Sequence, residues 1–203
     1  RAVRVVPVIR TRSAANARTV VGWLRDAGLR VFEITLTVPD APALIAELAT
    51  DPALLVGAGT VPDAAQARAC LDAGARFIVA PWVDPALAAP CREAEAVLML
   101  GALTPSEVRA ALAAGADVVK LFPAASAGGP AHVAALASVF PTVAFCPTGA
   151  IPPVGQKATP GNTLASAATC AGPPTEAAGN SFTTSAPASL SAPPAGSRQR
   201  RCR

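Results

Sequence analysis

Short apolar segments alternate with longer amphipathic segments through the first 151 residues of the chain. The short segments are rich in β-branched and aromatic residues, which is typical of strands. They predict seven strands, at Val3–Ile9, Val31–Leu36, Leu54–Ala58, Phe77–Ala80, Val97–Leu100, Val118–Phe122 and Val143–Phe145. The Ala-rich segments between them predict helices, which we expect to begin at Ser13, Asp40, Pro62-Asp63 and Thr104. Three of these segments end in a glycine suited to a left-handed helix terminus, at Gly28, Gly74 and Gly115.

The strand and helix units repeat at a nearly constant length, because the predicted strands start 20 to 28 residues apart. Continuous apolar strands separated by helices indicate a parallel sheet. An open doubly wound sheet and a (β/α)8 TIM-type barrel both fit this pattern. The even spacing favours the α/β barrel. Its eighth strand is expected near residues 165–175, but no strand-like run is recognisable there, so we predict an incomplete barrel.

The composition changes abruptly after Ile151. Residues 152–203 consist mostly of Pro, Gly, Ala, Ser and Thr and contain few large apolar side chains. Such a segment cannot offset its ordering entropy by burial. We therefore predict a barrel domain at 1–151 and a disordered low-complexity tail at 152–203. Residues 1–151 have no net charge, so the tail supplies the whole formal charge of +4 and the pI of about 9.1 does not indicate a basic binding face.

Composition also narrows the classes of partner and the compartment. No apolar run reaches the roughly 18 residues of a membrane span, and the first ten residues do not resemble a signal peptide. The single histidine excludes a multi-histidine metal site. The basic end of the tail lacks the aromatic residues that accompany nucleic-acid binding. Five cysteines without a CxxC motif indicate free thiols in a reducing compartment, so we predict a cytoplasmic protein.

Lys120 lies in the middle of an apolar predicted strand and is the only lysine before the tail. Burial disfavours the charged ammonium form and leaves an amine that can attack a carbonyl carbon. The alternative is an edge strand from which the side chain reaches solvent.

Glu33 belongs to a polar face on another predicted strand. The spacing of two places Glu33, Thr35 and Thr37 on one face and apolar residues on the other. A polar face on a strand covered by helices is typical of a barrel interior. A carboxyl group there could exchange protons near neutral pH, although Arg10 or backbone groups could instead satisfy it as a structural carboxylate.

Several small or polar residues stand at the predicted strand ends, which converge on one face of a parallel barrel where substrates bind. They are Arg10, the sequence Gly57-Ala58-Gly59-Thr60, Pro81 and Pro147-Thr148-Gly149. A Gly-rich turn alone is a weak signal, but together with an interior Lys and Glu these residues form a candidate site.

Six motifs resemble the class I aldolases that act on 2-keto-3-deoxy-6-phosphogluconate (KDPG), a family that includes 4-hydroxy-2-oxoglutarate aldolases. The motifs are VVPVIR (5–10), FEITLTVPDA (32–41), VGAGTV (56–61), FIVAP (77–81), VVKLFPA (118–124) and FCPTG (145–149). The resemblance runs in order from about Val3 to Ile151, and residues 152–203 do not share it.

The resemblance implies a role for each matching residue. Lys120 matches the lysine that forms a Schiff base with a pyruvyl carbonyl, and Glu33 matches the general acid/base. Residues that line the pocket and orient the small-molecule 2-keto acid are matched by Arg10, Thr60, Pro81, Phe122 and Thr148. Gly149 matches one glycine of a pair that helps bind the phosphate. The resemblance also implies an aldehyde-lyase of the Entner–Doudoroff route that needs no cofactor or metal and forms a homotrimer.

The sequence departs from the family pattern at single positions and in the tail. The single departures are Ala80, the pair Leu100-Gly101, Ala125 and Ala150. We hypothesise that a reading-frame shift after codon 151 produced the tail, which the nucleotide sequence can test. Two alternatives to the aldolase stay open: an inactive remnant of this family, and a phosphate-binding barrel isomerase or epimerase. Without an eighth strand we expect weak stability and little KDPG cleavage.

Overall fold

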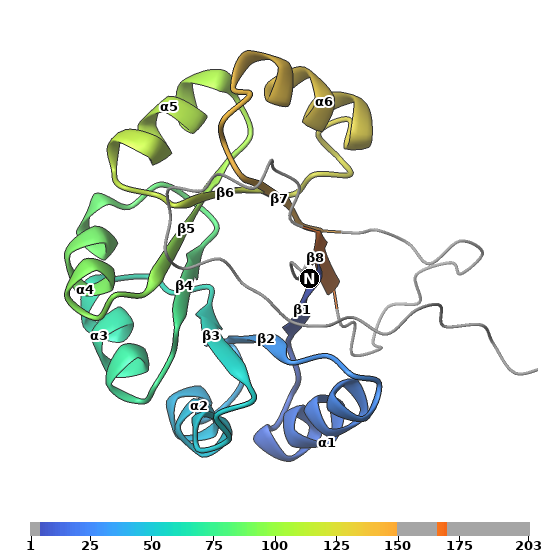
Figure 1. Ribbon diagram of the computed structural model, residues 1–203, viewed down its shortest axis with the longest axis vertical. Coiled ribbons are helices and arrows are strands. Elements are labelled where there is room, and N and C mark those ends of the chain that lie inside the picture. Colours follow the sequence, from blue (N-terminus) through green and yellow to red (C-terminus); the bar gives the residue numbers. More distant parts are fainter. Residues whose placement is uncertain (1–4, 150–165, 170–203) are drawn as a thin grey trace, which may run out of the picture.

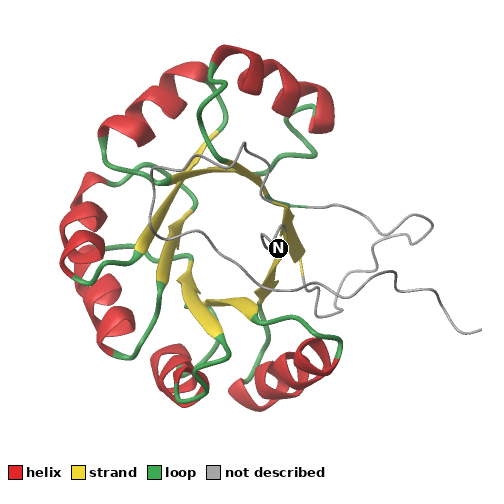
Figure 2. Cartoon of the chain, viewed as in Figure 1, coloured by secondary structure: helices red, strands yellow, loops and turns green. Residues whose placement is uncertain are grey.

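The computed structural model describes residues 5–149 and 166–169. Strands alternate with helices along the chain, and the strands curl into a ring with the helices outside it (Figures 1 and 2). The first half contains β1 (Val5–Ile9), α1 (Ala14–Asp26), β2 (Val31–Thr35), α2 (Ala41–Ala49), β3 (Leu55–Gly59), α3 (Ala64–Asp72) and β4 (Phe77–Ala80). The second half contains the 3-10 helix η1 (Pro85–Leu87), α4 (Ala88–Glu93), β5 (Val97–Ala102), α5 (Pro105–Ala113), β6 (Val118–Leu121), α6 (Gly129–Val139), β7 (Phe145–Pro147) and β8 (Ser166–Thr169).

The sheet confirms the predicted parallel α/β architecture. Strands β1 to β7 follow one another in chain order and pair in parallel. All seven lie where the sequence predicts strands. The seventh starts two residues later than expected, because a turn bond from the Val143 amide to the Phe140 carbonyl (3.1 Å) precedes it.

β8 differs from the sequence prediction, which finds no strand between Ala165 and Thr175. The four residues 166–169 pair with β1 in antiparallel orientation, with Val5 opposite Thr169 and Val8 opposite Ser166. An unpaired strand edge offers a row of backbone donors and acceptors, and a partner needs no particular side chains to bond to them. Hydrogen bonds join β8 to β1 but not to β7, so the ring is a curled sheet rather than a closed barrel of parallel strands.

Side chains on the strands alternate between two apolar clusters. The larger cluster lies between the sheet and the helices and includes Phe32, Ile34, Val119 and Leu121. The smaller cluster comes from the alternate positions, which face the inside of the ring. Its buried members are Val6, Val8, Val31, Phe77, Val79, Val97, Met99 and Cys146. This smaller cluster fills the interior of the ring toward the N-terminal ends of the strands. Polar groups inside the ring are therefore shielded from water from that end.

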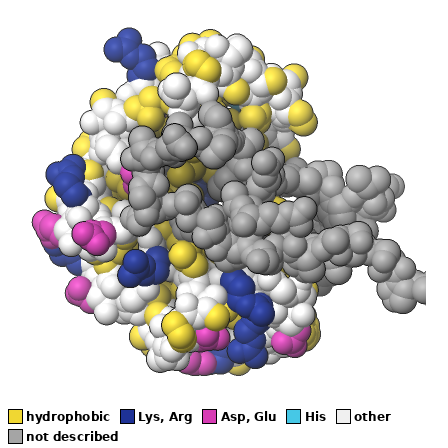
Figure 3. Space-filling view, in the orientation of Figure 1, with side chains coloured by type: hydrophobic (Ala, Val, Ile, Leu, Met, Phe, Trp, Pro, Cys, Tyr) yellow, Lys and Arg dark blue, Asp and Glu magenta, His cyan; other side chains and the backbone are white. Residues whose placement is uncertain are grey.

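Charged side chains are distributed unevenly over the outer surface. On the face shown in Figure 3 they lie mainly over α1 to α4, whereas the part over α6 is largely uncharged. Helix α6 contains no Asp, Glu, Lys or Arg. No helix in the described ranges is long and apolar enough to cross a membrane.

Candidate active site

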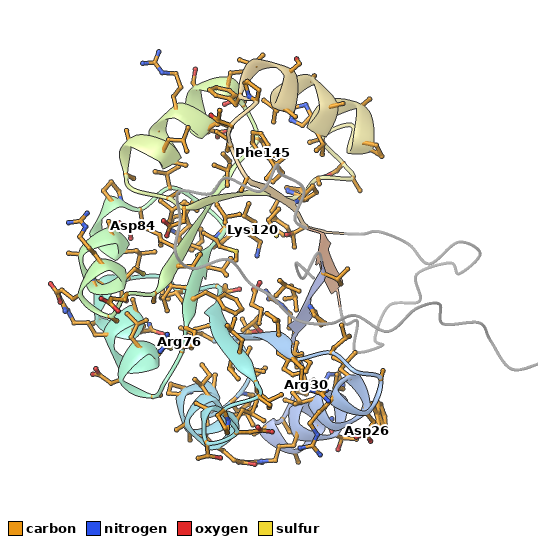
Figure 4. The ribbon with its side chains drawn as sticks, in the orientation of Figure 1. Asp26, Arg30, Arg76, Asp84, Lys120 and Phe145 are labelled. Carbon is orange, nitrogen blue, oxygen red and sulfur yellow. The ribbon has the colours of Figure 1, made fainter. Side chains whose placement is uncertain are left out.

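Lys120 lies inside the ring, on β6. Its neighbours Val119 and Leu121 belong to the outer cluster, so alternation directs the lysine inward, and Figure 4 shows its amine pointing toward the centre. The residue is 6% exposed. Because β6 has β5 on one side and β7 on the other, the alternative of a solvent-reaching lysine on an edge strand is wrong.

Glu33 reaches across the ring from β2 toward the same point. Its Oε1 lies 3.6 Å from Nζ of Lys120, and both side chains are buried. This oxygen has no hydrogen-bond partner among the residues that the structure describes. Burial raises the pKa of Glu33, and the charges of Lys120 and Arg10 only partly oppose that effect. Neither Arg10 nor a described backbone group makes a hydrogen bond to this oxygen.

Glycine residues on β3 make room for the Glu33 side chain. A methyl group on Gly59 would overlap the carboxyl group of Glu33, and one on Gly57 would overlap the ring of Phe77. Gly59 pairs with Thr35 in the β2–β3 register, so it faces the interior directly beside the β2 polar face. The absence of a side chain at Gly59 therefore leaves the space that the Glu33 carboxyl group occupies.

The rim of the site is formed by residues at the C-terminal ends of the strands. Arg10, after β1, donates a hydrogen bond of 3.0 Å to Oγ1 of Thr60, after β3. Thr60 has φ of 58°, a left-handed conformation that is uncommon for a β-branched residue. The Pro81 carbonyl lies against Gly101, where a side chain would overlap it. Gly101 in turn pairs with Lys120.

The ends of β6 and β7 complete the rim. The Phe122 ring centroid is 5.7 Å from Nζ of Lys120, and the ring is 41% exposed. Thr148 is buried, its amide donates to the Leu121 carbonyl (2.8 Å) and its carbonyl accepts from Ala124 (2.9 Å). Gly149 has φ of 96° and lies against the Phe122 ring. These bonds hold the loops after β6 and β7 together beside the lysine.

The structure therefore brings every sequence-predicted site residue to one end of the ring, with Lys120 and Glu33 below the rim. Sequence reasoning did not assign roles to Thr35, Thr37 and Gly101, although the polar face of 33–37 carried a signal for the two threonines. The roles of the individual residues remain predictions.

Other reactive groups lie away from this arrangement. The free thiols of Cys70 and Cys91 are buried on α3 and α4, and burial raises the pKa of each to about 11. Both thiols stay protonated at neutral pH and are poor nucleophiles. Within residues 5–149, no group of three or more His, Cys, Asp or Glu side chains could hold a metal ion.

A buried amine beside a buried carboxyl group is suited to carbonyl chemistry. The amine can form an imine with a ketone, and the carboxyl group can move protons at the neighbouring carbon and oxygen atoms. An anion can bind at Arg10 and Thr60 on the rim. The arrangement suits an acidic carbonyl compound held through its acid group and attacked by the amine.

Comparisons with known proteins show the family to which this chain is related. The relatives include the 2-dehydro-3-deoxy-phosphogluconate aldolase of Zymomonas mobilis, which is 36% identical over 149 residues, 73% of this chain and 72% of the relative. The KHG/KDPG aldolase of Escherichia coli is 35% identical over 154 residues, 75% of this chain and 72% of the relative.

Solved structures agree with the sequence relatives. The Zymomonas mobilis aldolase with 3-phosphoglycerate matches with a TM-score of 0.67 and 36% identity, over 73% of this chain and 71% of that one. The KDPG aldolase of Legionella pneumophila, with pyruvate captured as a covalent carbinolamine, matches with a TM-score of 0.66 and 37% identity, over 72% and 71% of the two chains. The family model for KDPG and KHG aldolase matches residues 1–172, which includes β8. The chain belongs to the KDPG and KHG aldolase family.

Proposed function

We propose that the chain is a class I aldolase that cleaves KDPG to pyruvate and glyceraldehyde 3-phosphate, and 4-hydroxy-2-oxoglutarate to pyruvate and glyoxylate. The observation that carries the proposal is the 3.6 Å approach of the buried Lys120 amine to the buried Oε1 of Glu33. The names of the relatives support the same reaction, and the Legionella pneumophila structure captures pyruvate covalently.

The proposed reaction begins at Lys120. Its neutral amine attacks C2 of the 2-oxo acid, and loss of water gives a protonated imine. Glu33 removes the proton of the C4 hydroxyl, the C3–C4 bond breaks, and its electron pair moves into the imine to form an enamine. The aldehyde leaves, a proton returns to C3, and hydrolysis releases pyruvate and the free amine.

The rim residues would orient the substrate for these steps. Arg10 and Thr60 present a guanidinium and a hydroxyl group to an anion. Phe122 and Pro81 would form apolar walls on either side of the reacting carbons. Thr148 and Gly149 would offer hydroxyl and backbone groups on the β7 side of the mouth.

Borohydride trapping with pyruvate tests this function sharply, because the chain contains only two lysines, Lys120 and Lys157. Reduction should attach one pyruvyl group to the peptide that contains Lys120. The variant Lys120→Arg should lose both the adduct and turnover, whereas the matched variant Lys157→Arg should keep them. An adduct confined to Lys157 would overturn the proposal.

The same experiment separates the alternatives. An inactive remnant of the family gives no adduct on Lys120 and no cleavage. A phosphate-binding isomerase or epimerase gives no adduct either, but keeps its activity in Lys120→Arg. An adduct on Lys120 together with lyase activity leaves only the aldolase.

The assembly and location are also proposals. We infer a homotrimer from the family resemblance, which light scattering of the purified chain would test against a monomer. Cytoplasmic location is supported by the free thiols of Cys70 and Cys91. Cell fractionation would test the location.

A further inference from the structure

The C-terminal end of β2 lies between two residues of the rim. On one side, Oγ1 of Thr35, the last residue of β2, donates to the Ile9 carbonyl (3.1 Å), and Arg10 follows directly after Ile9. On the other side, the amide of the next residue of the chain donates to the Gly59 carbonyl (2.8 Å), and Thr60 follows directly. The 3.0 Å bond from Arg10 to Thr60 therefore crosses the end of β2.

Thr37 follows in the turn at this end of β2. Its side chain is exposed, whereas that of Thr35 is fully buried and faces the interior of the ring. The two hydroxyl oxygens are 2.8 Å apart, so the hydroxyl group of Thr37 is directed toward the interior as well. Thr37 thus belongs to the part of the rim that Arg10 and Thr60 form.

This part of the rim adjoins the reacting amine. Oε1 of Glu33 lies 3.6 Å from Nζ of Lys120. Burial raises the pKa of Glu33, and Lys120 and then Arg10 oppose that rise, so the Arg10 charge acts close to the reacting groups. In a 2-oxo acid the carboxylate is bonded directly to the carbon that the amine attacks. An anion site this close to the amine suits that carboxylate.

A backbone carbonyl determines which threonine donates. The Ile9 carbonyl can only accept, so Thr35 must use its single hydroxyl proton in that bond. Thr37 is consequently the donor in the bond between the two threonines. A carboxylate is a stronger acceptor than a neutral hydroxyl group, because a hydrogen bond to an ionised group is about twice as strong. A carboxylate beside Thr37 would therefore compete successfully for its proton.

We propose that Thr37 donates a hydrogen bond to the acid group of the 2-oxo acid, beside Arg10 and Thr60, and so selects acidic ketones over neutral ones. The inference rests on the proposed function, in which Arg10 and Thr60 present their polar groups to an anion. When the substrate binds, the hydroxyl proton of Thr37 turns from Thr35 to the carboxylate. Thr35 keeps its own bond to the Ile9 carbonyl, so no buried donor loses its acceptor.

Reductive trapping on Lys120 tests the inference by comparing pyruvate with acetone, which has a methyl group in place of the carboxylate. Cyanoborohydride at low ketone concentration gives a trapping rate for each ketone, measured by mass spectrometry on the peptide that contains Lys120. Thr37→Val replaces the hydroxyl group by a methyl group of similar size, and Thr37→Ser keeps the hydroxyl group. Thr19→Val is the matched control, because Thr19 is an exposed residue of α1.

Thr37→Val should lower the trapping rate with pyruvate by about 10-fold or more, because a hydrogen bond to a charged group is lost. The rate with acetone should stay unchanged, since acetone has no carboxylate to accept the bond. Thr37→Ser should resemble the parent chain, and Thr19→Val should leave both rates unchanged. An unchanged rate with pyruvate in Thr37→Val, or an equal loss with both ketones, would overturn the inference.

A parent chain that forms no adduct on Lys120 counts against the proposed function rather than against the role of Thr37. Calorimetry with oxamate, which carries the same acid group but an amide in place of the ketone, then decides that role. Thr37→Val should weaken oxamate binding by about 10-fold or more, and Thr37→Ser should not. Equal binding to the parent chain and to Thr37→Val, or no binding to either, contradicts the inference.

Discussion

Glu33 is buried, and its Oε1 has no hydrogen-bond partner among the residues that the structure describes. Both conditions favour the neutral form of the carboxyl group. Its raised pKa has burial as the main cause, with Lys120 and then Arg10 opposing. A general base must be ionised, so cleavage should increase with pH as Glu33 loses its proton, over a range above the ordinary titration of a glutamate. Glu33→Gln should lower kcat/KM by about 100-fold or more and abolish its increase with pH over this range. The measurement is a pH profile of kcat/KM for both proteins. An increase with pH that persists in Glu33→Gln contradicts the role of Glu33 as the general base.

Gly59 provides a second prediction at the residue scale. A methyl group there would displace the Glu33 carboxyl group, so Gly59→Ala should lower turnover by about 10-fold or more, since a displacement of the order of 1 Å can cost 10²-fold. The matched control is Gly22→Ala on α1, where an added methyl group meets nothing within 4 Å. That control should raise the free energy of unfolding by about 0.5–1 kcal/mol with unchanged turnover. Normal turnover in Gly59→Ala would mean that Glu33 is not held where the reaction needs it.

Helix starts differ in how they are stabilised, although the sequence predicted them by one rule. Thr104 and Glu107 form a complete capping box at α5, with the Thr104 hydroxyl accepting from the Glu107 amide. Asp40 also begins a helix, but its φ of 57° leaves the side chain without a capping bond. Thr104→Ala should therefore lower the free energy of unfolding by about 1 kcal/mol. Asp40→Asn should change it far less, because asparagine tolerates the left-handed conformation. Urea denaturation of the two variants compares them, and equal losses contradict the distinction.

Glu107 adds a pH dependence to the same element. Hydrogen bonds from Leu103 and Thr104 hold the pKa of Glu107 below its usual value. The stabilisation is present above the unfolded-state pKa and is lost as the pH falls through the lowered folded-state pKa. Glu107→Gln should thus lower stability near neutral pH and converge with the parent chain in acid. Urea midpoints measured across this range check the prediction, and a constant difference contradicts it.

The strands and most helix boundaries could be predicted because they depend on local patterns. Ser13, Asp63 and Thr104 accept the bonds expected of helix caps, and Gly28, Gly74 and Gly115 have positive φ as expected. The inward direction of Lys120 and Glu33 follows from strand alternation alone. Their 3.6 Å separation could not be predicted, because it depends on ring curvature and on the space at Gly59. Which of Thr35 and Thr37 donates in the hydrogen bond between them depends likewise on the Ile9 carbonyl, which belongs to another strand.

At the scale of the whole molecule, the strands of the parallel sheet differ in whether they are hydrogen-bonded to a strand on one side or on both sides. β3 is bonded to a strand on each side, whereas β7 is bonded only to β6 among the described strands. Amides of β7 should therefore exchange with deuterium faster than those of β3 under native conditions. Peptide-resolved exchange followed by mass spectrometry compares residues 145–147 with 55–59. Equal protection would indicate that another segment or chain covers the β7 edge.

The orientation of β8 determines at which face of the ring this strand ends. In a ring of parallel strands each strand delivers the following loop to the catalytic mouth, and phosphate groups commonly bind the loops after the seventh and eighth strands. Here Ser166 lies opposite Val8 and Thr169 opposite Val5, so the last residue of β8 lies beside the first residue of β1. β8 therefore ends at the face of the ring opposite the candidate site, whereas β1 to β7 all end at the face that carries it.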